Sequence, residues 1–373
     1  MRVAPPDRLH ARVLGVRQAL VARRLDGLVV TSLPNIAYLA GFFASAAALV
    51  VTTDEVILLG DSRYAESLAS RARECPFICP LQLPTGGSYD QGLVDALAPL
   101  RGAAIGFEPD HLTVSRHRYL TDRLGNAGWD ASLAACEGVV EHLRARKDAW
   151  EIGVLREGGA RLSDVAKCIL SNVLAGRTER EVAGEIDLEL RRAGFERAAF
   201  DTIVASGANA ALPHARAGQR RIEQGDLVVL DFGGVLGGYC SDLSRTLVAG
   251  LASGRERRVI EQVVEAQGAA FAAVRPGAAP ESVDAAARDV LAGHGIANAF
   301  THGTGHGLGL EVHEAPRVAR VRPGHVEPPL EAGMVLTLEP GAYFPGWGGV
   351  RIEDDVLVTN DGAEWLTNVP KVP

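Results

Sequence analysis

The sequence predicts an α/β front domain over residues 1–140, followed by an α+β domain over residues 141–373. Three observations support this division. With 373 residues, the chain is too long for one ordinary domain and long enough for two. Helix and strand signals alternate through its first third. In the second part, glycine runs such as Gly237-Gly238 separate strongly apolar segments.

The elements of the front domain follow from hydrophobic spacing and turn residues. Leucines and valines recur at helical spacing from residue 8, and Asp26-Gly27 ends the helix that they predict. Thr53-Asp54 is the expected turn between two strands. The predicted helices cover 8–24, 62–73 and 111–124, and the predicted strands cover 28–30, 46–52, 55–59 and 102–107.

A charged segment, residues 137–150, is predicted as the junction between the domains. We expect a long helix to follow it and to run to about Leu174. Beyond it, Gly-rich turns between apolar runs are typical of an antiparallel sheet. Further helices are expected at 178–193, 254–274 and 280–294.

Composition excludes several classes of protein. Apolar residues make up 47% and charged residues 23%, the balance of a soluble globular protein. The net charge is −8 without a basic stripe, which argues against nucleic acid as a partner. The longest apolar stretch, 41–51, is too short to cross a membrane. The polar first residues do not resemble a signal peptide, so we expect a cytoplasmic protein. Five scattered cysteines do not form a disulfide framework.

Two aspartates lie on the arms of a predicted hairpin, LVVLDFGGVLGGYCSDLSRTLV, at residues 227–248. Asp231 and Asp242 are eleven residues apart, one on each arm. This odd separation across an even-membered turn predicts that they face each other on one side of the ladder. Carboxylates so placed repel each other unless a cation lies between them. The alternative is that each aspartate faces water or makes a turn.

Three histidines occur within the segment HGTGHGLGLEVHE, and the whole chain has only ten. They are His302, His306 and His313, and four glycines lie among them. Glycine lets the backbone pass close to a ligand or to another strand. Neutral imidazole is a common metal ligand and can also take part in proton transfer, so the segment is a candidate site.

Two glutamates follow apolar runs in MVLTLEPGAYFPGWGGVRIEDDVLV, residues 334–358. Glu339 is expected at the end of one strand and Glu353 within the next. A carboxylate in such a setting must be paired, hydrogen-bonded or bound to metal. The structural alternative is a buried pair between a glutamate and Arg351.

Together these segments supply two aspartates, two glutamates and one imidazole. Their four negative charges match two divalent cations, and an oxygen-rich site with one imidazole favours Mn²⁺ or Co²⁺ over a thiolate zinc site. Two ions about 3.5–4 Å apart lower the pKa of a water between them toward neutrality. The residues therefore indicate metal-assisted hydrolysis.

The order of these residues resembles the ligand set of the pita-bread metallopeptidases, which include methionine aminopeptidase, aminopeptidase P and prolidase. LDFGG, SDLSRT, HGTGHGLGLEVHE, TLEPG and VRIEDD carry the resemblance over residues 150–373. The front domain is similar to the creatinase-like N-terminal domain of the proline-specific members, with SLPNIAYLAGF and DSRY as weaker markers. The resemblance implies a pita-bread catalytic domain preceded by a smaller creatinase-like α/β domain.

The resemblance also implies a metal-binding role for each matching position. Asp231 would bind one metal in bidentate fashion, and Asp242 and Glu353 would bridge both. His306 and Glu339 would hold the other metal. Glu339 would also take a proton from water and pass it to the leaving proline nitrogen. Mn²⁺ is the expected metal, with Co²⁺ and Zn²⁺ as alternatives.

Five further positions match substrate-binding residues of the family. His214, in the stretch ASGANAALPHA, matches the substrate-binding histidine of the proline-specific members. His302 and His313 match two more active-site histidines, and His313 would hydrogen-bond the developing oxyanion. Tyr343 and Arg351 match pocket residues. We expect all three histidines to contribute to catalysis.

The implied activity is hydrolysis of the N-terminal Xaa-Pro bond of proline-containing peptides by a homodimer. Aminopeptidase P accepts longer peptides and prolidase accepts only dipeptides, and the shared metal site does not separate the two. The sequence slightly favours an aminopeptidase. The alternative from another class is a peptide-binding module without catalysis, against which the complete ligand set argues.

Overall fold

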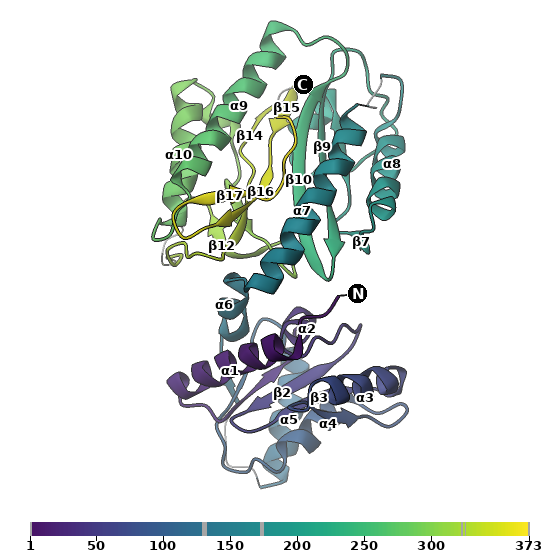
Figure 1. The fold of residues 1–373 in the computed structure, drawn as a ribbon, viewed down its shortest axis with the longest axis vertical. Coiled ribbons are helices and arrows are strands. Elements are labelled where there is room, and N and C mark those ends of the chain that lie inside the picture. The colour runs from purple at the N-terminus through teal and green to yellow at the C-terminus, as the bar shows by residue number, and fades with distance from the viewer. Residues whose placement is uncertain (1, 129–132, 172–174, 322–323, 325, 372–373) are drawn as a thin grey trace. The chain divides into compact units, whose positions relative to one another are not determined.

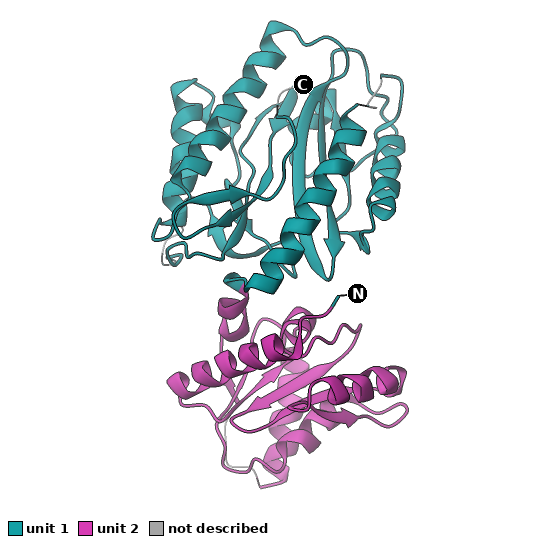
Figure 2. Ribbon diagram, in the orientation of Figure 1, with its two compact units in different colours: residues 1–2, 145–373 teal, residues 3–144 magenta. Residues whose placement is uncertain are grey.

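The computed structural model describes residues 2–128, 133–171, 175–321, 324 and 326–371. The chain forms two compact units, one of Val3–Arg144 and one of Met1–Arg2 with Ala145–Pro373 (Figure 2). The division falls after Arg144, four residues beyond the expected position. Helix α6, Val139–Ala145, accounts for the difference: Val139 and Val140 are buried, and Arg144 Nη1 donates to Asn35 Oδ1 within the front unit (2.7 Å).

A mixed six-stranded sheet forms the centre of the front unit, in the order β4-β3-β2-β1-β5-β6 (Figure 1). The central strand β1 pairs in parallel with β5 and antiparallel with β2, and it is buried along its whole length. The strands are β1 Gly27–Val30, β2 Ala48–Thr52, β3 Val56–Gly60, β4 Cys79–Gln82, β5 Ile105–Phe107 and β6 Leu133–Ala135.

Helices α1 Pro6–Arg23, α3 Ala65–Glu74 and α5 Val114–Asn126 of this unit lie where the sequence predicts helices. Two further helices, α2 Leu33–Ala40 and α4 Tyr89–Leu97, were not predicted, nor were strands β4 and β6. Helix α2 escapes detection because Asn35–Ala40 are all buried, so no polar face marks a helical period.

The second unit contains two antiparallel sheets and a separate hairpin. The first sheet consists of β7 Arg197–Ala198, β8 Ile203–Ser206, β9 Leu227–Leu236 and β10 Tyr239–Val248. The second consists of β11 Gly305–Gly307, β12 Glu314–Val318, β13 Val335–Leu338, β16 Asp354–Val358 and β17 Ala363–Trp365. The hairpin pairs β14 Gly341–Phe344 with β15 Gly348–Arg351. The predicted antiparallel architecture is confirmed.

Helices cover these strands in two groups (Figure 1). α7 Ala149–Leu170 and α8 Glu179–Arg192 share an apolar core with β8, β9 and β10. α9 Gly254–Ala273 and α10 Pro280–Gly293 share another with β13 to β16. The long helix begins at an Asp148–Glu151 capping box and ends at Leu170, and Leu174 lies outside the described residues.

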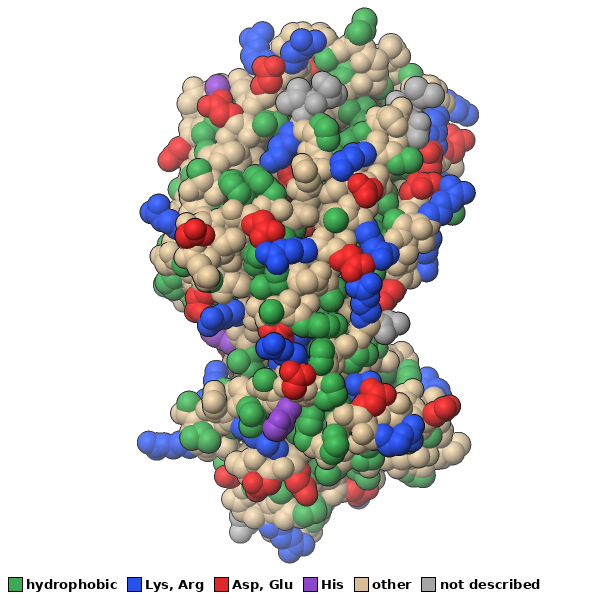
Figure 3. Space-filling view, in the orientation of Figure 1, with side chains coloured by type: hydrophobic (Ala, Val, Ile, Leu, Met, Phe, Trp, Pro, Cys, Tyr) green, Lys and Arg blue, Asp and Glu red, His purple; other side chains and the backbone are tan. Residues whose placement is uncertain are grey.

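Charged side chains of both signs are mixed on the surface in Figure 3, and the described helices include no evident membrane span. On the face in Figure 3, acidic and basic side chains are interspersed and no continuous basic stripe runs across it. None of the helices within the described ranges is both long and apolar enough to span a membrane.

Candidate metal centre

The β9–β10 hairpin places Asp231 and Asp242 on the same face of the first sheet. Asp231 lies opposite Ser244, and Asp242 lies opposite Gly233. The expected common side of the ladder is therefore confirmed, but the two aspartates are diagonal neighbours and do not pair directly. The reason is the two-residue turn Gly237-Gly238: a residue pairs with the one equally far from the turn, and Asp231 lies farther from it than Asp242.

The short strand β11 carries His306 between β12 and β13. Both of its glycines are needed for this position. A Cβ on Gly305 would lie 1.9 Å from Thr337 O, and a Cβ on Gly307 would lie 2.1 Å from Ala315 O. The glycines flanking His306 thus allow close strand packing, as the sequence predicts.

Glu339 directly follows β13, whereas Glu353 lies between β15 and β16 and not within a strand as expected. Glu353 forms an isolated antiparallel bridge with Ser244 of β10, and its backbone N–H donates to Ser244 O (3.0 Å). The Ser244 hydroxyl donates to Glu353 Oε2 (2.7 Å). This bridge connects the two sheets and brings Glu353 beside the aspartates.

The predicted metal-binding residues converge on one cavity of about 1120 Å³. One ligand atom from each of Asp242, His306 and Glu353 lies within 4.8 Å of the other two. His306 Nε2 is 3.8 Å from Glu339 Oε1. Asp231 lines the same cavity. Among the ten predicted site residues, only Tyr343 is not in its lining.

Three carboxylates of the cavity, Glu339, Asp242 and Glu353, have pKa values above their ordinary range. Burial raises the pKa of Glu339 to about 8. Burial first, and then the charge of Asp231, raises the pKa of Asp242 well above its ordinary value. Glu353 is affected in the same direction by burial and by Asp242. Buried carboxylates this close need protons or cations between them.

His306 is held as a neutral imidazole, the form in which histidine binds metal ions. Its Nδ1 lies 3.0 Å from Gly307 O, and because a carbonyl only accepts, Nδ1 carries the proton. The lone pair of Nε2 is therefore directed to the carboxylate side. Burial, with a smaller effect of His313, lowers the pKa of His306 to about 4.

Arg351 is the buried cation of the cavity. Its Nη2 donates to Asp231 Oδ2 (2.5 Å), so the expected alternative of a glutamate–arginine pair is wrong. Its Nη1 donates to the Tyr343 hydroxyl (3.0 Å), which lies 2.8 Å from His302 Nε2. His302 Nδ1 lies 2.8 Å from Gly303 O. Both ring nitrogens of His302 are thus engaged, and Tyr343, which does not line the cavity, contacts two residues that do.

The donor set fits divalent cations. Asp231 Oδ1 and Asp242 Oδ1 are buried and have no hydrogen-bond partner among the described residues. Such orphaned carboxylate oxygens are costly unless a cation approaches them. Carboxylate oxygens with one imidazole suit metals such as Mn²⁺. The residues present can therefore hold the metal ions that the resemblance to the pita-bread metallopeptidases implies.

His214 and His313 lie on the open side of the same cavity, and both are exposed. His214 is in the loop after η2, Gly207–Ala211. The ring of His313 lies 4.2 Å from that of His306. Exposure leaves both imidazoles accessible to a substrate entering the cavity.

Three residues that support the centre were missed by sequence reasoning. Ser244 contacts Glu353, and Asp355 Oδ2 accepts a hydrogen bond from Asp242 N (3.1 Å). Gln267 Nε2 donates to Leu338 O (2.9 Å), next to Glu339. Two signals were available: Ser244 shares a strand face with Asp242, and Gln267 is a polar residue on the apolar face of a predicted helix.

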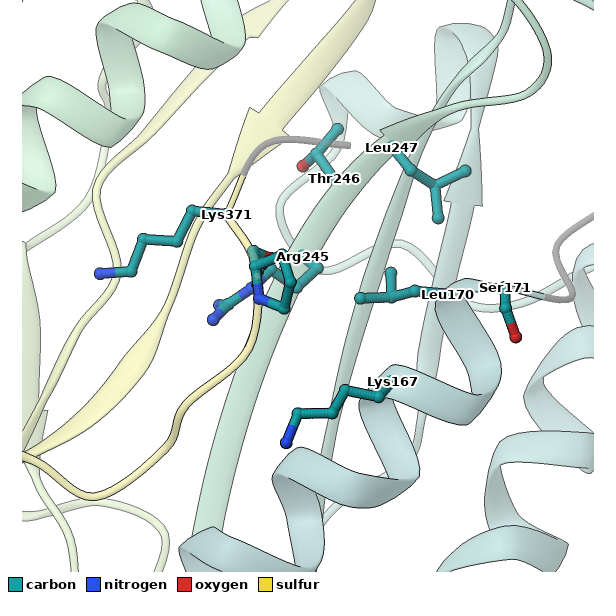
Figure 4. Close-up of a pocket in the computed structure, with 8 residues that line it drawn as sticks. Lys167, Leu170, Ser171, Arg245, Thr246, Leu247 and Lys371 are labelled. Carbon is teal, nitrogen blue, oxygen red and sulfur yellow. Dashed lines mark hydrogen bonds between the residues drawn. The ribbon is translucent and has the colours of Figure 1, made fainter.

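A second cavity, of about 390 Å³, contains none of the predicted site residues. Lys167 of α7, Arg245 of β10 and Lys371 near the C-terminus surround it (Figure 4). Arg245 is already paired with Asp354 Oδ1 (2.7 Å) and with Pro370 O (3.0 Å). Its guanidinium serves the fold rather than a ligand.

The family profile of metallopeptidase family M24 matches residues 153–360, and that of the creatinase/prolidase N-terminal domain matches residues 12–146. The uncharacterized peptidase YqhT of Bacillus subtilis is 37% identical over 347 residues, covering 93% of this chain and 95% of its own length.

Two solved structures match the fold of this chain over nearly its whole length. The Xaa-Pro dipeptidase from Bacillus anthracis has a TM-score of 0.89 and 34% identity, covering 98% of this chain and all of its own. The X-Pro aminopeptidase from Thermotoga maritima has a TM-score of 0.85 and 29% identity, covering 97% and 99%. The expected pita-bread domain with a creatinase-like front domain is thereby confirmed, and the chain belongs to metallopeptidase family M24, in the branch that contains the Xaa-Pro peptidases.

Proposed function

We propose that this protein is a metal-dependent exopeptidase that hydrolyses the bond between an N-terminal residue and a following proline. The convergence of four carboxylates and one imidazole on a single cavity, in a chain of this family, is the observation that supports the proposal. Asp231, Asp242, His306, Glu339 and Glu353 are the proposed ligands of two divalent cations.

When bound, two such cations would polarise the substrate carbonyl and lower the pKa of a water molecule held between them. Glu339 is the candidate to accept the proton of this water and to return it to the leaving nitrogen. Its elevated pKa of about 8 in the absence of metal indicates a carboxylate that can hold a proton in this cavity. Exposed His313 is the candidate donor to the substrate carbonyl.

An Xaa-Pro bond is a tertiary amide without an N–H, and its ring fixes φ. An enzyme that cuts it must recognise the ring and the carbonyl instead of the missing donor. His214 and His313 would line this subsite. His302 would contribute through its ring face, because both of its nitrogens are engaged by Tyr343 and Gly303.

Two length preferences are consistent with this chemistry. The sequence slightly favours an aminopeptidase, and one solved relative is named X-Pro aminopeptidase. The name of the Bacillus anthracis relative, Xaa-Pro dipeptidase, favours the dipeptidase form. Comparing kcat/KM for an Xaa-Pro dipeptide with that for an Xaa-Pro-Xaa tripeptide decides between them: turnover of the dipeptide alone identifies a dipeptidase.

The metal requirement is tested by exhaustive chelation followed by reconstitution. We expect chelation to abolish Xaa-Pro hydrolysis and Mn²⁺ or Co²⁺ to restore it, with two ions bound per chain. Zn²⁺ is included as the alternative metal. Full turnover by chelated, metal-free protein would refute the proposal. The homodimeric state and the cytoplasmic location stay predictions from the sequence.

A further inference from the structure

A buried carboxylate outside the candidate metal centre contacts both ends of the loop that carries His214. Glu179, the first residue of α8, has no solvent exposure. Its Oε1 accepts hydrogen bonds from the backbone N–H of Ser206 (2.9 Å) and from the Ser206 hydroxyl (2.8 Å). Its Oε2 accepts one from Gly218 N (3.1 Å). Ser206 and Gly218 delimit the loop, so one carboxylate ties its two ends together.

Backbone groups at the start of α8 also hold the end of this loop. The first N–H groups of a helix have no partner within the helix. Here Glu179 N donates to Arg220 O (3.0 Å) and Arg180 N donates to Gly218 O (3.0 Å). The start of α8 therefore holds both the end of the loop, at Gly218 and Arg220, and its beginning, at Ser206.

The remainder of the loop is held at two more points. Ala215 is buried in a small cluster with Ala205, Ala210 and Val229. Pro213 O accepts a hydrogen bond from Arg351 Nη1 (3.2 Å). His214 lies between these two fixed residues and is exposed to the cavity. The position of His214 thus depends on how firmly the two ends of the loop, Ser206 and Gly218, are held.

The donors at the two ends of the loop require a side chain that only accepts hydrogen bonds. The groups that meet Glu179 are all donors, including Asn209 Nδ2 at 3.0 Å. An ionised carboxylate satisfies all of them, whereas an amide presents one acceptor and one donor. Helix capping does not explain the residue, because the capping box of α8 is complete with Thr178 and Glu181.

We propose that Glu179 is a positioning residue that fixes the loop of residues 206–218 so that His214 meets the substrate. The kinetic part of this proposal rests on the proposed function, and the structural part does not. Glu179→Gln keeps the size of the side chain but turns an NH₂ group toward at least one donor. It should therefore release one end of the loop without removing a proposed metal ligand.

The test combines hydrogen exchange, metal analysis and kinetics on the full chain. In Glu179→Gln we expect amide exchange in residues 206–218 to rise at least tenfold. We expect kcat/KM for an Xaa-Pro peptide to fall at least tenfold, mainly through KM, with unchanged metal content. Glu181→Gln is the matched control, because it perturbs the same helix terminus without contacting the loop. It should match the wild-type protein in loop exchange, metal content and kcat/KM.

Unchanged exchange in the loop would overturn the anchoring role, and faster exchange with wild-type kinetics would overturn the positioning role. Unfolding or metal loss in Glu179→Gln would make the residue a general stability element and would also overturn the proposal. If the wild-type protein did not cleave Xaa-Pro peptides, the proposed function would fail. Exchange in residues 206–218 would still decide whether Glu179 anchors the loop.

Discussion

Single residues in the cavity differ in what they contact, and this separates metal binding from substrate recognition. His306 is close to Glu339 and forms a potential ligand group with Asp242 and Glu353. His214 lines the cavity from an exposed loop and is not in that group. Substituting the two histidines should therefore have different consequences.

We predict that His214→Ala retains near-normal metal but loses at least about tenfold in kcat/KM, which is about 1.4 kcal/mol of transition-state stabilisation. His306→Ala should lower metal occupancy, because it removes a proposed ligand. Metal analysis and kinetics on both variants check this. Metal loss in His214→Ala would make it an unforeseen ligand, and wild-type kinetics would remove it from the site.

At the scale of elements, the strand that carries His306 tolerates no side chain beside it. We predict that Gly305→Ala costs more than about 2 kcal/mol of stability and weakens metal binding. The reason is that its Cβ would lie 1.9 Å from Thr337 O of the neighbouring strand, so β11 would have to move.

Gly268→Ala is the control for this substitution. Gly268 lies within α9, and a Cβ there meets nothing within 4 Å. Alanine should stabilise the helix by about 0.5–1 kcal/mol. Melting temperatures and metal titrations of both variants make the comparison. Equal stability of the two variants would show that β11 can adapt, and would contradict the packing argument.

At the scale of the whole molecule, metal and pH should act together on stability. Glu339 has an ordinary pKa of 4.5 and a folded, metal-free pKa of about 8. Between these values the folded chain keeps a proton that the unfolded chain has lost. The contribution of Glu339 to the stability of the metal-free protein is therefore fully present below pH 4.5 and is lost as the pH rises to about 8.

We therefore predict that the gap in melting temperature between metal-loaded and chelated protein widens from pH 5 to pH 8. One such group changes stability by up to about 1.4 kcal/mol per pH unit. Metal binding displaces the protons and gains affinity over the same range. Thermal melts at matched ionic strength measure the gap, and a gap that narrows with pH would contradict this account.

Every proposed metal ligand lies in the unit of residues 145–373. We predict that a fragment of residues 145–373, if folded by circular dichroism, binds metal with the stoichiometry of the full chain. The front unit should affect only which peptides are cleaved. Loss of metal from a folded fragment would show that residues 3–144 contribute to the site.

Much of the fold could be predicted because periodicity and turn residues are local signals. The helices expected at 178–193, 254–274 and 280–294 agree with α8, α9 and α10 to within one residue at each end. Helices α2 and α4 were missed because each is short, and α2 lacks a polar face. Register was harder: the face shared by Asp231 and Asp242 follows from parity, but their diagonal pairing depends on where the turn lies.

The sequence by itself determined the residue types of the site, since each candidate ligand interrupts an apolar or glycine-rich run and needs a partner there. Only the tertiary structure decided which partners they have. Arg351 pairs with Asp231, Ser244 joins Glu353 to the first sheet, and Glu179 closes the loop of His214. These contacts join residues 27 to 120 positions apart. No local sequence pattern encodes contacts between residues so far apart in the chain, because these contacts arise from the packing of whole elements against one another.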